Sequence, residues 1–129
     1  MIYGVGVDLL AVERIRLILN SDGLAHFDKV LTPWEQAAAA AHPSLALYCA
    51  SRFAAKEAVF KCLRTDVAFR LNLIEIQTDD AGRPFPRLSG QAKQIADDAG
   101  IVKIDLSLSY DTDYATAFAV ASTAESNAY

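Results

Sequence analysis

Apolar and polar residues follow one another in the first half of the chain in the pattern of one strand and several helices. Residues 1–7 are apolar and rich in β-branched side chains, which predicts a buried strand ending at Asp8. Thr32, Pro33 and Glu35 have the sequence of a capping box with proline at the first helical position. We predict helical segments over residues 9–20, 24–30, 33–41 and 45–63.

The second half of the chain alternates in the way that half-buried strands do. Residues 73–78 alternate apolar and polar side chains, and prolines limit a short strand that begins at residues 83–86. A helix over residues 90–99 is expected to end at Gly100. Two further strands, joined by a tight turn into an antiparallel hairpin, are expected over residues 101–110 and 114–122.

This order of elements, one strand, then helices, then strands around a single helix, predicts an α+β fold. The 129 residues are 53% hydrophobic, which is enough to build one core. Because the sequence contains no repeat, low-complexity tract or linker, we expect one domain over residues 1–129.

The charge distribution narrows the possible partners. The net charge is −4, with 7 bases and 6 acids in residues 1–64 but 5 bases and 10 acids in residues 65–129. A general nucleic-acid binder carries a basic excess, so no nucleic-acid partner is expected. Any bound anion must meet a local cluster of bases, for which the first half of the chain is the better place.

The location of the protein is also suggested by the sequence. No apolar run is long enough to span a membrane, and no basic stretch precedes the first apolar run, so neither a membrane span nor a signal peptide is expected. Cys49 and Cys62 fall in one predicted helix, too far apart for a disulfide, which favours reduced thiols and a cytoplasmic location.

Two acids and a lysine are candidates for binding a metal ion and a phosphate. Glu57 and Lys61 lie four residues apart in the longest predicted helix, so they project from the same face. That spacing is also typical of ordinary surface ion pairs. Asp8, at the end of the first strand, is well placed to hold a hard cation, although its spacing alone favours a cap or turn acid after the strand. The preceding Gly-Val-Gly-Val lacks the third glycine of a dinucleotide fingerprint.

Two motifs together resemble those of a known enzyme family. The first is Gly6-Val7-Asp8 followed by Glu13-Arg14-Ile15, and the second is the run from Phe53 to Lys61, Phe-Ala-Ala-Lys-Glu-Ala-Val-Phe-Lys. In this order and at this separation they resemble the holo-acyl-carrier-protein synthase family of 4′-phosphopantetheinyl transferases. Weaker similarities continue in order along nearly the whole chain. The resemblance implies a transferase-like fold with a small antiparallel sheet packed on a long central helix.

The resemblance also implies a reaction. The phosphopantetheine arm of coenzyme A is transferred to a serine of an apo acyl carrier protein, releasing adenosine 3′,5′-bisphosphate. The family pattern assigns Asp8 and Glu57 as ligands of Mg²⁺, a hard ion that binds carboxylates and substrate oxygens. Lys61 would contact the phosphates, and Glu57, or a water that it holds, is a candidate base for the incoming serine.

Further site residues follow from the resemblance. Arg14, and less strongly Arg16, would dock the acidic recognition helix of the carrier protein. Short members of the family are homotrimers with active sites between subunits, which requires exposed apolar surface on the monomer. Residues expected to contact coenzyme A, in addition to Lys61, are Arg52, Lys56, Gly82, Arg83, Pro84, Ser109 and Tyr110, with Ser107 as a further candidate.

The sequence departs from the family pattern at two positions. Tyr110 stands where many members have histidine, and Lys29 stands where an arginine is common. A phenol cannot replace imidazole as a base at neutral pH, although it can donate a hydrogen bond to a phosphate. The departures leave open a homologue that binds coenzyme A and carrier protein without efficient turnover. An unrelated Mg²⁺-dependent phosphohydrolase using the same acids is a third possibility. The sequence does not distinguish a fatty-acid carrier from a polyketide carrier.

Overall fold

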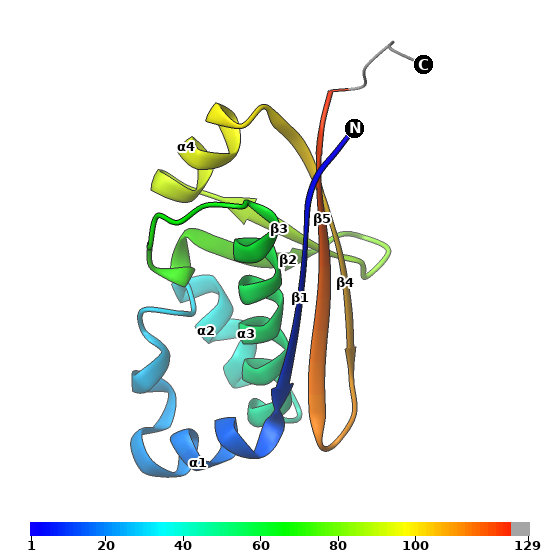
Figure 1. Ribbon diagram of the computed structural model, residues 1–129. Helices are drawn as coiled ribbons and strands as arrows, with labels where there is room; N and C mark the ends of the chain where they lie inside the picture. The colour runs from blue at the N-terminus through cyan, green and yellow to red at the C-terminus, as the bar shows by residue number, and fades with distance from the viewer. Residues whose placement is uncertain (125–129) are drawn as a thin grey trace.

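The computed structural model describes residues 1–124, which form an antiparallel sheet covered on one face by helices (Figure 1). The sheet has the strand order β1-β5-β4, and a second, two-stranded sheet pairs β2 with β3. The strands are β1 (Ile2–Ala11), β2 (Ile74–Thr78), β3 (Pro84–Leu88), β4 (Ile101–Tyr110) and β5 (Tyr114–Thr123). The helices are α1 (Val12–Asp22), α2 (Pro33–Ala41), α3 (Leu45–Cys62) and α4 (Gly90–Asp98), with short 3₁₀ turns η1 (Gly23–Phe27) and η2 (Leu71–Leu73). The predicted α+β class is confirmed.

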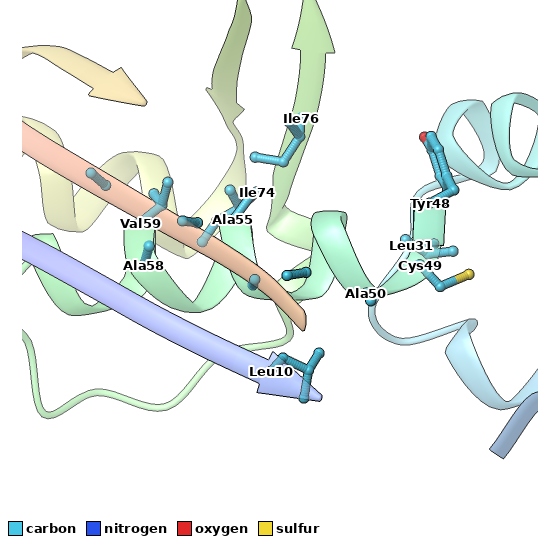
Figure 2. Close-up of a cluster of buried hydrophobic side chains, with 14 of the residues drawn as sticks. Leu10, Leu31, Tyr48, Cys49, Ala50, Ala55, Ala58, Val59, Ile74 and Ile76 are labelled. Atoms are coloured by element: carbon cyan, nitrogen blue, oxygen red, sulfur yellow. The ribbon is translucent and has the colours of Figure 1, made fainter. Parts of the chain in front are cut away.

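Helix α3 packs against the sheet through very small residues. Alternate residues of β5 that face the helix are alanines, and all four are buried: Ala115, Ala117, Ala119 and Ala121. Figure 2 shows Ala55, Ala58 and Val59 of α3 within this core, with Ile74 and Ile76 of β2 nearby. Small side chains on both sides let the backbones of helix and sheet approach closely.

Two glycines bring β1 especially close to α3. A Cβ atom on Gly6 would collide with the carbonyl oxygen of Ala58, and one on Gly4 would collide with that of Cys62. Both collisions are with backbone, which cannot rotate away as a side chain can. Glycine is therefore required at both positions, and the contact holds the Asp8 region of β1 beside the second half of α3.

The start of α1 differs from the prediction. The helix was expected from residue 9, but β1 continues to Ala11. Residues 8–11 pair with residues 117–114 of β5. The amide of Val12 then donates to the carbonyl of Asp113 at 2.9 Å. This long-range pairing prevails over the local helical pattern, so Asp8 lies within a strand rather than at its end.

Most other elements agree with the prediction. Thr32 and Glu35 form the expected capping box at the start of α2, and the side chain of Ser44 accepts a hydrogen bond from the Leu47 amide at the start of α3. Cys49 and Cys62 are free and buried, as expected, and burial raises the pKa of their thiols to about 11 and about 12. No helix within residues 1–124 is long and apolar enough to cross a membrane.

The face of the three-stranded sheet opposite α3 is not covered by the described residues. It exposes Val5, Val7 and Leu9 of β1 and Phe118 of β5, each roughly half accessible or more. The register places Phe118 between Val7 and Ser107, so these side chains form one continuous surface. A contiguous apolar surface of this kind marks an interaction site in a folded protein. We call it the outer face.

Candidate active site

Asp8 and Lys61 meet where β1 passes the second half of α3. The Lys61 ammonium donates to the Val7 carbonyl at 2.9 Å and lies 3.4 Å from a carboxylate oxygen of Asp8. The Lys61 side chain is 50% exposed and that of Asp8 is 18% exposed. Thr116 of β5 fixes the strand by donating its hydroxyl to the Asp8 carbonyl at 2.8 Å. The structure therefore brings Asp8 and Lys61 together from distant parts of the chain.

Glu57 belongs to the same cluster. Partial burial raises the pKa of its carboxyl, the negative charge of Asp8 raises the pKa further, and Lys61 acts in the opposite direction. The negative charges of Asp8 and Glu57 thus repel each other between β1 and α3. We call Asp8, Glu57 and Lys61 the carboxylate cluster.

The carboxylate cluster is small for a metal site made by protein alone. Within residues 1–124, no group of three or more His, Cys, Asp or Glu side chains gathers closely enough to hold a metal ion. Two carboxylates suit Mg²⁺, which keeps several water molecules and takes substrate phosphate oxygens as ligands. The donor set therefore fits an ion that completes its coordination with a phosphorylated substrate.

Lys56 does not belong to a phosphate site, and its predicted contact with coenzyme A is wrong. Its side chain is fully buried, and its ammonium lies 2.6 Å from the Glu35 carboxylate. The same ammonium also donates to the carbonyls of Leu71 and Ile74. Because these partners occupy its donors inside the protein, no phosphate can reach it.

Arg52 lies on α3 one turn before Lys56, away from the carboxylate cluster. Its guanidinium stacks on the Tyr48 ring, 4.6 Å from the ring centroid, and donates to the Ser51 hydroxyl at 3.2 Å. The Arg52 Nε and the Tyr48 hydroxyl are both buried without a hydrogen-bond partner among the described residues. Buried polar atoms left unpaired call for a ligand or water. Tyr48 was missed by the sequence analysis, since an aromatic residue in a helix usually indicates only core.

The predicted nucleotide-contacting turn lies far from the carboxylate cluster within one chain. Gly82 has φ 81°, and Asp79 holds the turn by accepting from the amides of Ala81 and Arg83 at 2.9 Å each. Figure 1 shows this turn between β2 and β3 projecting beyond β4, on the side of the sheet away from α3. Gly82, Arg83 and Pro84 are therefore presented together, but away from the carboxylate cluster.

The serines of β4 also face away from the carboxylate cluster. Asp8 and Leu108 are both paired with Ala117 of β5, so they share the face that is covered by α3. Successive side chains of a strand alternate between faces, which places Ser107 and Ser109 on the outer face. Tyr110 ends β4 and is 51% exposed.

Arg14 and Arg16 have different surroundings on α1. Arg14 lines a cavity of about 190 Å³ between α1, η1 and α3 whose other walls are mostly apolar. Arg16 points elsewhere and forms an exposed ion pair with Glu13 at 3.3 Å. The other residues that line the cavity are Leu10, Ile15, Ile18, His26, Phe27, Val30 and Phe53.

Comparison with known proteins identifies the family. Residues 4–119 match the 4′-phosphopantetheinyl transferase superfamily. A holo-[acyl-carrier-protein] synthase of Clostridium acetobutylicum is 39% identical over 121 residues, which are 93% of this chain and 97% of that protein. The solved acyl carrier protein synthase of Plasmodium yoelii with ADP bound has a TM-score of 0.88 and 37% identity, over 97% of this chain and 98% of that one.

A second solved structure adds a ligand. The holo-(acyl-carrier-protein) synthase from Bacillus anthracis in complex with CoA (3′,5′-ADP) has a TM-score of 0.79 and 28% identity, over 96% of this chain and 99% of that one. The chain thus belongs to the 4′-phosphopantetheinyl transferase superfamily and, within it, to the holo-[acyl-carrier-protein] synthase family of transferase enzymes. The resemblance and the transferase-like fold predicted from the sequence are confirmed, whereas the roles of individual residues stay predictions.

Proposed function

We propose that this protein transfers the 4′-phosphopantetheine group of coenzyme A to a serine of an apo acyl carrier protein in a Mg²⁺-dependent reaction. The observation that carries the proposal is the carboxylate cluster, in which two acids and a lysine from distant parts of the chain converge. Relatives of the same length and fold named as holo-acyl-carrier-protein synthases support it, as does a coenzyme A complex of one of them.

Asp8 and Glu57 would hold the Mg²⁺. A divalent cation bound there would relieve the mutual repulsion of their carboxylates, whose oxygens are ligands that Mg²⁺ prefers. Bound there, Mg²⁺ would neutralise negative charge on the phosphate oxygens of the substrate.

The remaining chemistry can be assigned to side chains of the chain itself. The serine hydroxyl forms a bond to the phosphorus that carries the pantetheine arm, and the bond from that phosphorus to the leaving adenosine 3′,5′-bisphosphate breaks. Lys61 supplies positive charge to the phosphates, because half of its side chain is exposed and its contact with Asp8 is long. Glu57, or a water that it holds, is our candidate acceptor of the serine proton, because Glu57 belongs to the cluster that would receive the substrate phosphates.

Coenzyme A binding would use Arg52 on α3 and the turn of a second subunit. Arg52 is only partly buried, so its guanidinium can offer positive charge to a phosphate. The Gly82, Arg83 and Pro84 turn, together with Ser109, is directed away from the carboxylate cluster of its own chain. Tyr110 pairs with Ala115 of β5 and therefore lies on the other face of the sheet, at the exposed end of β4. One ligand can contact both groups of residues only when two chains combine, which supports an active site between subunits.

A homotrimer built on the outer face would provide such sites. Val5, Val7, Leu9 and Phe118 would lose their exposure to water in the assembly, which is a favourable change of the kind that drives association. The same face carries Ser107 and Ser109, so association would deliver them to a neighbouring subunit.

The carrier protein would dock beside α1. Arg14 lies at an apolar cavity, so a partner helix with acidic side chains around an apolar residue would match both the charge and the cavity. Arg16 is a weaker candidate because Glu13 already pairs with it.

Mass spectrometry of a small panel of apo carrier proteins, incubated with this protein, coenzyme A and Mg²⁺, tests the proposal. We expect one phosphopantetheine per carrier, no product when a chelator removes Mg²⁺, and a trimer mass by light scattering. Coenzyme A binding without product from any carrier would favour a homologue without turnover. Release of free phosphopantetheine without a carrier would favour a phosphohydrolase.

A further inference from the structure

The Lys56 ammonium joins three separate parts of the fold at one buried point. Its donors reach the Glu35 carboxylate of α2 at 2.6 Å, the Leu71 carbonyl in η2 at 3.3 Å and the Ile74 carbonyl at the start of β2. Both charged side chains are completely inaccessible to water. An ammonium has three donors, and these three acceptors use all of them.

The Glu35 carboxylate is equally well occupied. One oxygen accepts from the Thr32 amide at 2.9 Å, in addition to Lys56, and the other accepts from the Ile76 amide at 2.8 Å. A second link runs alongside, because the Thr32 hydroxyl donates to the Glu75 carboxylate at 2.6 Å. The pair therefore binds the N-terminus of α2, the middle of α3 and the first residues of β2 to one another.

The β2–β3 hairpin depends on such a connection. It is a separate two-stranded sheet, and a hairpin of two strands is at best marginally stable without further support. Apolar contacts of Ile74 and Ile76 hold it against the core, but such contacts have little directionality. Hydrogen bonds to a buried charge fix both distance and direction, so the pair defines where the hairpin sits relative to α3.

We infer that Lys56 and Glu35 are positioning residues for coenzyme A, because they hold the hairpin that carries the Gly82, Arg83 and Pro84 turn in a fixed place relative to α3. The inference rests on the proposed function, in which this turn contacts the nucleotide. Stability alone would not require this pair, because apolar residues often replace a buried ion pair without loss of stability. Neither residue touches the reacting atoms, so the expected effect is on coenzyme A binding.

Two variants and one control test the inference. Lys56→Met keeps the unbranched stem of the side chain and removes its ammonium, and Glu35→Gln keeps the shape of its side chain and replaces the carboxylate with a neutral amide. Lys93→Met is the matched control, because Lys93 is exposed and its ammonium bonds only to Asp97 among the described residues. All three variants are studied below their unfolding temperatures. If Lys56→Met does not fold, Glu35→Gln alone is used for the test.

The first measurement is hydrogen exchange, and the second is steady-state kinetics. We expect backbone amides of residues 74–88 to exchange about tenfold faster in both variants than in the wild type, while those of β1 do not. We expect the KM for coenzyme A to rise about tenfold, with kcat at saturating coenzyme A within about threefold. Lys93→Met should leave both measurements unchanged.

Two results would overturn the inference, and they differ from a failure of the proposed function. A folded variant whose KM for coenzyme A stays within about twofold of the wild type would reduce the pair to a structural role. A fall in kcat alone would assign it to the chemical step instead. If the wild type transfers no phosphopantetheine, the proposed function fails and the inference about coenzyme A falls with it. The exchange measurement still reports independently whether the pair holds the hairpin.

Discussion

Two lysines five residues apart on α3 each pair with a carboxylate from a distant part of the chain, and the two pairs differ in nearly every physical respect. The Lys56–Glu35 contact is 2.6 Å long and both side chains are fully buried. The Lys61–Asp8 contact is 3.4 Å long, with side chains that are 50% and 18% exposed. The buried pair has filled its hydrogen-bonding capacity within the protein, whereas the open pair keeps capacity for a ligand.

Neighbouring charged residues of α3 serve different purposes. Glu57 lies next to Lys56 in sequence but faces the open pair, where Asp8 repels its carboxylate. A hundred degrees of helical rotation between neighbouring residues is enough to separate a structural lysine from the acid of the active site. Charges that satisfy each other hold the fold, and charges that repel or only partly pair are available for binding.

The largest expected effect separates the two lysines by stability. Lys56→Met leaves the Glu35 carboxylate buried without its partner, which should lower the free energy of unfolding by about 3–5 kcal/mol. Lys61→Met breaks a half-exposed pair and should change it by about 0–1 kcal/mol. Urea denaturation of both variants measures the difference. Equal losses would show that the two pairs contribute alike to stability.

The next effect concerns activity at the open pair. Asp8→Asn removes a proposed metal ligand, so we expect about 3–4 kcal/mol of lost transition-state stabilisation, or roughly two to three orders of magnitude in rate. Its folding stability should stay close to that of the wild type. Phosphopantetheine transfer followed by mass spectrometry measures the rate, with Asp97→Asn on the surface of α4 as the control. Retention of most of the activity would remove Asp8 from the site.

The smallest effect is a pH dependence that arises from Glu57. Because burial and Asp8 raise the pKa of its carboxyl, the folded protein binds this proton more readily than the unfolded chain. Stability contributed by the protonated form is therefore present at low pH and falls as pH rises through the window between the ordinary pKa and the raised one. Carboxyl carbon NMR titration should show the pKa of Glu57 lowered in Asp8→Asn and raised further in Lys61→Met. An unchanged titration in both variants would mean that the three groups do not interact.

Local sequence patterns predicted most of the fold. The bounds of α3, the capping box of α2 and the hairpin of β4 and β5 all depend on short-range signals, and they agree with the structure. The end of β1 could not be predicted in this way. Residues 9–11 have a helical pattern, and only their pairing with β5, more than a hundred residues later, makes them a strand.

The same limit applies to the site. The motif around Glu57 placed Glu57 and Lys61 on one helix face, because their spacing is local, and the structure brings Asp8 beside them. The burial of Lys56 depends on Glu35, 21 residues earlier, and on carbonyls 15 and 18 residues later. No pattern within the motif distinguishes a lysine that will be enclosed by such partners from one that will face a phosphate.

The layer of alanine and glycine between α3 and the sheet has a consequence for attempts to reshape this protein by mutagenesis. Larger side chains have no room there, since backbone already meets backbone at Gly4 and Gly6. Overpacking of this kind typically costs about 1–3 kcal/mol for each change. Libraries aimed at new substrates should therefore vary the exposed turns and the cavity beside α1, and leave the helix–sheet boundary untouched.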